Sequence, residues 1–146
     1  MPISPSPQGG SSSPPQGIGG SGSYPINTSN AVAIASGVTR FIMPGGQGQL
    51  SATETLVEGS VPVNGTFKQI EVRVATNANT GDTPFTLRLN NADTVLSVTY
   101  GNIETGVKRL ATNVTATQGQ TYSIEVTTVG AGAIDDMFIT LEFEPS

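Results

Sequence analysis

The clearest strand pattern in this chain is the stretch Gly65-Thr66-Phe67-Lys68-Gln69-Ile70-Glu71-Val72-Arg73-Val74-Ala75-Thr76. Its side chains divide into two alternating sets, Lys68, Ile70, Val72 and Val74 against Gln69, Glu71 and Arg73. This period of two predicts a strand with one face buried from Ile70 onward and the other in solvent, as in an antiparallel sandwich. One such strand is not stable alone, so the rest of the chain must supply a second sheet to cover it.

Similar patterns recur downstream of this strand, separated by turn signals at intervals of about eight to twelve residues. Residues 83–89 and 94–100 form two of them, and Asn90-Asn91-Ala92-Asp93 between them predicts a hairpin turn. Further strands are expected over 40–43, 51–57, 106–117, 122–127 and 137–143. Because no helical periodicity appears, we predict an all-β, antiparallel jelly-roll sandwich of about eight strands over residues 38–146.

Residues 1–37 are predicted to be an irregular N-terminal arm. The first 24 residues are mostly Pro, Gly, Ser and Gln, and the first charged residue is Arg40. Such a segment buries too little apolar surface to offset the entropy lost on ordering. It is either a solvated linker or an arm that becomes ordered against a partner. In the second case the anchors are its widely spaced apolar residues, Ile3, Ile18, Tyr24 and Ile26.

Composition excludes several functional classes. The chain has 146 residues, no His and no Cys, so histidine triads, thiol nucleophiles, disulfides and common zinc sites are ruled out. Its net charge of −5 and scattered basic residues argue against nucleic acid and anionic membranes as partners. No apolar run reaches the roughly 20 residues of a membrane span, and the start lacks the pattern of a signal peptide.

No motif for catalysis or for a cofactor was found. Asp135-Asp136 and the pair Glu142 and Glu144 are better explained as solvated strand positions than as a glycosidase pair. The polar loop 77–82 contains a single carboxylate, too few for a calcium site of the usual kind. Phe67, Phe85, Tyr122, Phe138 and Phe143 are interpreted as packing residues. We therefore predict a non-enzymatic chain with no cofactor, in which carbohydrate binding through loop residues such as Asn79 or Tyr100 stays an alternative.

Three blocks of sequence resemble a known family: residues 64–74, 85–99 and 116–126, read as NGTFKQIEVRV, FTLRLNNADTVLSVT and ATQGQTYSIEV. Together they are similar to a jelly-roll domain found in virion structural proteins of tailed phages. The chain departs from that family at Asn91, where glycine is frequent, and at Gln120, where aspartate is frequent.

The resemblance implies a location on the virion and a function as a capsid decoration (cement) protein that binds the major capsid protein and stabilises the assembled head. A tail or fibre component of the virion is the alternative within this family. A homotrimer is also expected, because trimers are common among such proteins and self-association would enlarge a small core. The threonine-rich segments 51–56 and 111–117 are the surfaces that we expect to meet in it.

Overall fold

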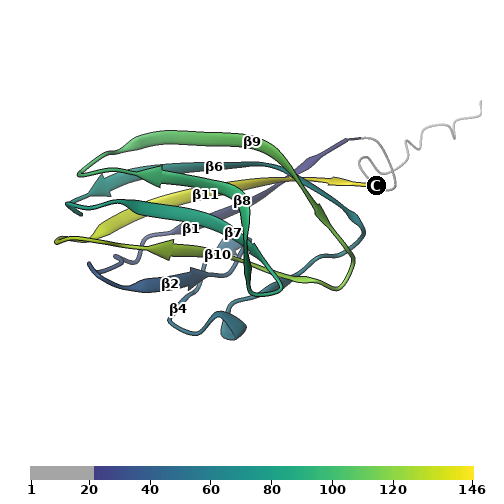
Figure 1. Cartoon of the computed structure of the whole chain (residues 1–146), viewed down its shortest axis with the longest axis horizontal. Coiled ribbons are helices and arrows are strands. Elements are labelled where there is room, and N and C mark those ends of the chain that lie inside the picture. Colours follow the sequence, from purple (N-terminus) through teal and green to yellow (C-terminus); the bar gives the residue numbers. More distant parts are fainter. Residues whose placement is uncertain (1–21) are drawn as a thin grey trace, which may run out of the picture.

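The computed structural model describes residues 22–146 and shows two β-sheets packed face to face (Figure 1). The first sheet has the order β3-β1-β11-β6-β9, and the second has the order β4-β2-β10-β7-β8, with β5 paired to β10. The strands are β1 (Tyr24–Asn30), β2 (Thr39–Ile42), β3 (Gly46–Gln47), β4 (Leu50–Ser51), β5 (Gly59–Ser60), β6 (Gly65–Asn77), β7 (Thr83–Leu89), β8 (Ala92–Tyr100), β9 (Gly106–Ala116), β10 (Thr121–Thr127) and β11 (Ile134–Pro145).

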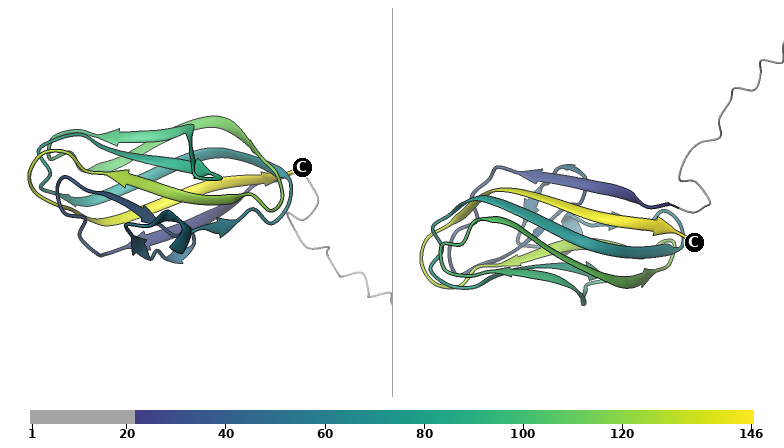
Figure 2. Two further views of the ribbon diagram at one scale, coloured as in Figure 1. Left: turned by 60° about the horizontal axis from the view of Figure 1, so that its bottom comes forward. Right: turned by 90° about the horizontal axis from the view of Figure 1, so that it is seen from above.

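The predicted jelly-roll sandwich is confirmed, and its eight longer strands are β1, β2 and β6 to β11. Figure 2 shows the two layers from the side, with β1, β11 and β6 in one layer and β7, β8 and β10 in the other. All pairings between the longer strands are antiparallel. The predicted hairpin between β7 and β8 is also present. Its turn residues Asn90 and Asn91 have the positive φ angles of a tight turn, 47° and 63°.

Strand β6, which carries the clearest pattern in the sequence, differs from that pattern at its start. Phe67 is buried together with Ile70, three positions later, whereas Lys68 is only half-buried. A register shift between Phe67 and Gln69 in the pairing with β9 makes this possible. The physical reason is aromatic packing, since the Phe67 ring lies 4.9 Å from that of Phe143 and 5.3 Å from that of Tyr122.

The core between the sheets is mainly apolar, and the hydroxyl group of Tyr100, which is fully buried in it, joins the two sheets. The Tyr100 ring packs edge to face on Phe85 at 5.7 Å. Its hydroxyl group donates to the backbone carbonyl oxygens of Val72 and Gly106, at 2.6 and 2.7 Å. Burial raises the pKa of Tyr100 to about 12. The hydroxyl thereby fastens β8 of one sheet to β6 and β9 of the other.

The predicted boundary between arm and sandwich, at residues 37 and 38, is wrong. β1 already belongs to the first sheet and pairs with β11 along its whole length, from Tyr24 opposite Phe143 to Asn30 opposite Met137. Ile34 adds a further bridge to Ile134 and is buried. The sequence did not predict β1, because its best-buried side chains, Thr28 and Asn30, are polar.

The segment expected as a strand over 51–57 is mostly not extended. After the two-residue β4 the chain forms a short 3₁₀ helix, η2 (Glu54–Leu56), over the second sheet. Glu54 turns inward there and pairs with Arg88 of β7 at 2.8 Å. Within residues 22–146 the structure contains no helix of the length and apolarity that a membrane span requires.

Candidate functional site

The first sheet presents its outer face to solvent, and cross-strand register arranges that face in rows. Ser29 of β1, Phe138 of β11, Arg73 of β6 and Val107 of β9 form one row. The next row is Asn27, Thr140, Glu71 and Arg109, in which Glu71 and Arg109 form an ion pair with an Nε to Oε2 distance of 2.8 Å. The second row is thus electrostatically satisfied, whereas the first combines an aromatic ring with a cation.

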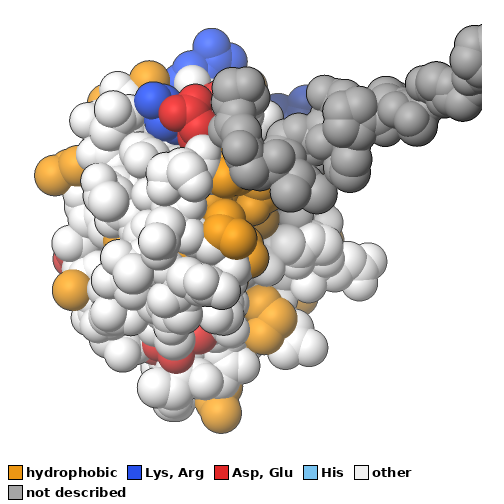
Figure 3. Space-filling view, turned by 90° about the vertical axis from the view of Figure 1, so that its right-hand side faces the viewer, with side chains coloured by type: hydrophobic (Ala, Val, Ile, Leu, Met, Phe, Trp, Pro, Cys, Tyr) orange, Lys and Arg blue, Asp and Glu red, His pale blue; other side chains and the backbone are white. Residues whose placement is uncertain are grey.

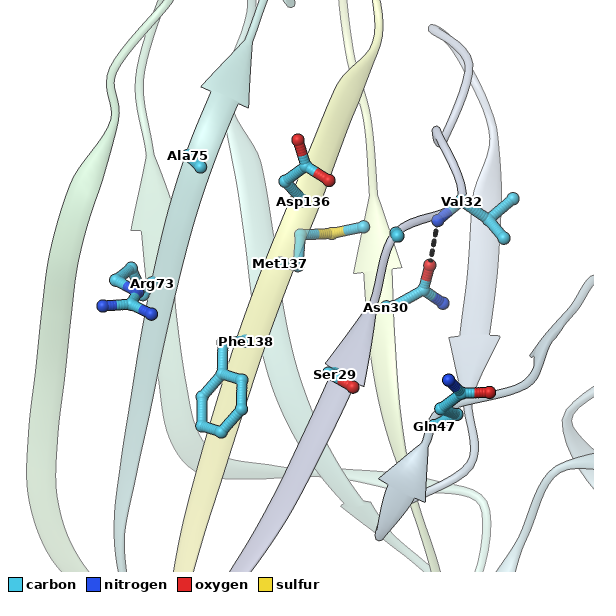
Figure 4. Close-up of a pocket in the computed structure, with 10 residues that line it drawn as sticks. Ser29, Asn30, Val32, Gln47, Arg73, Ala75, Asp136, Met137 and Phe138 are labelled. Atoms are coloured by element: carbon cyan, nitrogen blue, oxygen red, sulfur yellow. Dashed lines mark hydrogen bonds between the residues drawn. The ribbon is translucent and has the colours of Figure 1, made fainter.

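A hollow of about 440 Å³ lies at one end of this face (Figure 4). Its floor and walls come from four strands and one loop. They comprise Ser29 and Asn30 of β1, Val32 in the loop after β1, Asp136 and Phe138 of β11, Arg73 of β6 and Gln47 of β3. Its size falls within the range of about 300–1,000 Å³ that is usual for small-molecule sites. We call it the Phe138 hollow.

Phe138 is the most unusual residue of the hollow. Its side chain is 39% exposed, and the Arg73 guanidinium carbon lies 6.0 Å from the ring centroid. Sequence analysis took Phe138 for a packing residue, which is wrong. The signal was present in the strand expected over 137–143, because a period of two places Phe138 on the face opposite apolar Met137 and Ile139. The structure buries both neighbours and exposes Phe138.

Two opposite charges line the hollow without neutralising one another. Among residues 22–146, no carboxylate lies within 4.0 Å of the Arg73 guanidinium and no cation within that distance of the Asp136 carboxylate. Asp136 also has a left-handed φ of 52°, uncommon for a residue with a side chain inside a strand. Its backbone N–H donates to Asp135 Oδ1 at 2.7 Å, which supports this local turn.

Asn30 and Thr28 hold the β1 side of the hollow in place. Asn30 Nδ2 donates to the Gly48 carbonyl at 3.1 Å, and its Oδ1 accepts from the Val32 N–H at 2.7 Å. Thr28 Oγ1 accepts from the Gly45 N–H at 2.7 Å. The bonds to Gly45 and Gly48 connect β1 to the segment that contains β3 and Gln47. The wall is therefore built by tertiary hydrogen bonds and does not depend on a ligand.

A separate charged cluster on the second sheet is structural. Arg88 forms ion pairs with Glu54, Glu125 and Asp93 and stacks over the Phe41 ring at 5.6 Å. Burial alone would raise the pKa of Glu54, but hydrogen bonds from Arg88 and Ser123 outweigh it and hold that pKa below its ordinary value. Burial, followed by the charge of Asp93, raises the pKa of Glu125. The cluster fastens η2 to the sheet.

The other positions considered for ligands point elsewhere. Asn79 and Tyr100, expected as loop residues for glycan binding, are both buried, so that expectation is wrong for these two residues. In the loop 77–82, the side-chain oxygens of Asn77 and Asn79 accept from backbone N–H groups at 2.8 Å. Across residues 22–146, no three acidic side chains gather in a way that would suit a metal ion.

Of the four predicted arm anchors, the structure brings two into the sandwich. Tyr24 and Ile26 are half-buried residues of β1 that pack against the core, with the Tyr24 ring 5.7 Å from that of Phe143. They are corrected from arm residues to sandwich residues, because their strand closes the sheet beside β11. Ile3 and Ile18 lie outside the described residues.

Comparisons with known proteins support the fold alone. No protein-family model matches the sequence, and no curated protein sequence matches it. Among solved structures, the globular domain of zebrafish complement 1qA protein superposes with a TM-score of 0.53 at 11% identity, covering 82% of this chain and 95% of that domain.

Carbohydrate-binding modules appear among the weaker structural matches. A GH26-CBM35 β-(1,4)-mannanase of Podospora anserina gives a TM-score of 0.42 at 20% identity; the match covers 84% of this chain and 28% of that one. A family 35 carbohydrate-binding module of Clostridium thermocellum gives 0.37 at 14% identity, covering 75% and 98%. With TM-scores below 0.5, these two matches carry no inference about this chain.

Proposed function

We propose that this chain is a structural protein of a tailed-phage virion, and specifically a decoration protein that binds the assembled head through the major capsid protein. The observation that carries the proposal is the position of the three blocks that resemble such proteins. They coincide with β6, with the hairpin of β7 and β8, and with the turn into β10. The resemblance thus covers central strands of both sheets. A non-enzymatic role belongs to the same proposal and agrees with a sequence that lacks His and Cys.

The two ends of the described chain lie together at one end of the sandwich, which suits attachment by that end. β1 begins next to where β11 ends, so Gly22 lies close to Ser146. Apolar side chains are visible on this end (Figure 3), and Pro25, Pro62 and Val63 are exposed there. The Phe138 hollow lies at the opposite end of the strands. We therefore expect the end with the termini to face the capsid and residues 1–21 to contribute to binding there.

A homotrimer completes the proposal. The two threonine-rich segments lie on opposite sides of the molecule, since β9 is one edge of the first sheet and β4 is the far edge of the second. Glu54, the one charge within segment 51–56, is turned into the Arg88 cluster and does not oppose contact. Because the segments cannot meet within one chain, they can pack only between copies. Such a head-to-tail contact closes a ring when the rotation is right.

Localisation on the particle tests the main proposal. Gold-labelled antibody against this chain, applied to virions of the source phage, is expected to mark the whole head in many copies. Label at the tail alone would overturn decoration in favour of the tail component. Label on no particle would overturn the virion assignment and leave a free binding module, such as a carbohydrate-binding domain, as the function.

Removal of the N-terminal segment tests how the chain attaches. A variant lacking residues 1–21 keeps β1 and should fold, whereas one lacking residues 1–30 loses the seven-residue strand that pairs with β11 and should not. The first variant is expected to bind isolated heads more weakly than the full chain. Equal binding by the two folded proteins would show that residues 1–21 are only a linker.

A further inference from the structure

The Phe138 hollow combines three kinds of group that no other part of the described surface brings together. It has an exposed aromatic ring, a guanidinium without a carboxylate partner, and a carboxylate without a cationic partner. Each of the other five basic residues has a polar partner within residues 22–146: four form ion pairs, and Arg40 donates to the Thr39 carbonyl. Arg73 and Asp136 are the two charged residues that line the hollow, and neither has an ion-pair partner within residues 22–146.

The sign of these charges limits what the hollow accepts. An anionic ligand that approaches Arg73 would also meet Asp136, in a chain of net charge −5. A cationic ligand that approaches Asp136 would meet Arg73. A neutral ligand with many hydroxyl groups avoids both penalties, because each hydroxyl accepts a hydrogen bond from a guanidinium and donates one to a carboxylate. Gln47 adds an exposed amide that does both.

The aromatic ring supplies the remaining element of recognition. Phe138 stands on β11 between Ser29 on β1 and Arg73 on β6, so its ring occupies the middle of a row whose neighbours are polar (Figure 4). An apolar ring exposed within a polar rim is suited to the C–H face of a flat saturated ring. Pyranose sugars present such a face together with a rim of hydroxyl groups.

The backbone at Asp136 points to the same conclusion. A left-handed φ costs a residue with a side chain on the order of 1–2 kcal/mol, and strain of this kind concentrates at binding sites. At Asp136 it occurs beside Ala75, on the wall of the hollow, although the flanking pairs Asp135 with Thr76 and Met137 with Val74 are in regular register. The strain is thus local to the carboxylate that lines the site.

From these observations we propose that the Phe138 hollow is a binding site for a neutral saccharide. A hexopyranose ring stacks on Phe138, Arg73 donates to its hydroxyl or ring oxygens, and Asp136 accepts from its hydroxyl groups. No covalent step is involved. The site stands independently of the virion assignment, because the hollow lies at the end of the sandwich away from the termini and outside the two segments expected to form the trimer contact.

The test is a glycan array followed by calorimetry on the full chain. The array should carry neutral oligosaccharides of gluco, galacto and manno configuration, together with sialylated and sulfated glycans. Wild-type protein is expected to bind one or more neutral glycans. Phe138→Ala, Arg73→Gln and Asp136→Asn should each weaken that binding by about tenfold or more, the change that loss of one stacking contact or charge-assisted hydrogen bond produces.

Matched controls separate the site from general surface effects. Val95→Ala removes a 67% exposed apolar side chain from the outer face of the other sheet, and Arg40→Gln removes the other basic residue without an ion pair. Both should bind like wild type, and circular dichroism should show all five variants folded.

Three results would overturn the proposal. The first is no binding of any neutral glycan at millimolar concentration. The second is binding that Phe138→Ala leaves unchanged. The third is binding confined to anionic glycans, which would assign the hollow to anion recognition by Arg73. Localisation on the virion is measured separately. A negative glycan result therefore leaves the decoration proposal intact, and a negative localisation result leaves the saccharide site intact.

Discussion

Gly132 allows two loops at the end of the sandwich opposite the termini to approach each other by their backbones. A Cβ atom at Gly132 would overlap the carbonyl oxygen of Ala78, in the loop after β6. Two backbone hydrogen bonds join the same loops, from the Ala78 N–H to the Ala133 carbonyl and from the Thr80 N–H to the Ala131 carbonyl, both at 2.8 Å. Replacing Gly132 with alanine must therefore push the loops apart.

Gly119 provides a matched control for this change. Its φ of +90° nearly equals the +91° of Gly132, but an added Cβ there would meet no atom within 4 Å. Both alanine variants incur the strain of a left-handed residue, about 1–2 kcal/mol. Only Gly132→Ala also weakens two hydrogen bonds, at about 1 kcal/mol each, and disturbs the packing above buried Asn79. We expect losses of about 3–5 kcal/mol for Gly132→Ala and about 1–2 kcal/mol for Gly119→Ala.

Urea unfolding followed by far-UV circular dichroism measures both losses by linear extrapolation. The difference between the two variants is the decisive quantity, because the shared backbone strain cancels in it. Equal losses of stability in the two variants would refute the argument that close approach to Ala78 governs the choice of glycine at position 132.

Three further predictions concern stability and assembly. Tyr100→Phe should lose about 1–3 kcal/mol at neutral pH, because two backbone carbonyls lose a donor. Since the pKa of Tyr100 is raised to about 12, its contribution is present below pH 10 and is lost as pH rises toward 12, so alkaline unfolding curves should be flatter in the variant. Arg88→Met should lose about 2–4 kcal/mol of stability at pH 7, because Glu54 and Glu125 are left without their cation. Part of this loss should be recovered near pH 4, where both carboxylates are protonated. Arg40→Met is the control, and an equal loss from Arg88→Met at both pH values would contradict the prediction. Native mass spectrometry at micromolar concentration should give three times the chain mass of 14.9 kDa, and a persistent monomer would refute the trimer.

Much of the sandwich could be predicted from local sequence, because burial of one face imposes a period of two. The inward sets on β8, on β10 and on β11 from Met137 onward follow this rule, and the structure buries Leu96, Ile124 and Ile139 as the pattern indicates. The turn after β7 was equally local, since asparagine adopts a positive φ more readily than other residues with side chains.

β1 could not be predicted in the same way, because its buried residues are polar and depend on distant partners. Thr28 is satisfied by the N–H of Gly45, and Asn30 by the carbonyl of Gly48 and the N–H of Val32. Pro25 and the polar residues of β1 hide the apolar and polar alternation that marks a strand. A polar side chain is buried at low cost only after its hydrogen-bond partner has arrived, and that arrival is a tertiary event.

The sequence by itself determined the all-β class, the strand periods of β6 to β11, and a composition that rules out histidine and thiol chemistry. Only the tertiary structure decided where β1 belongs, how Phe67 enters the core, and that Ser29, Arg73, Asp136 and Phe138 share one hollow. These four residues come from three strands far apart in the chain. Alternation specifies which face a side chain occupies, but the neighbours it meets depend on strand order and register, which follow from burying both sheets at once.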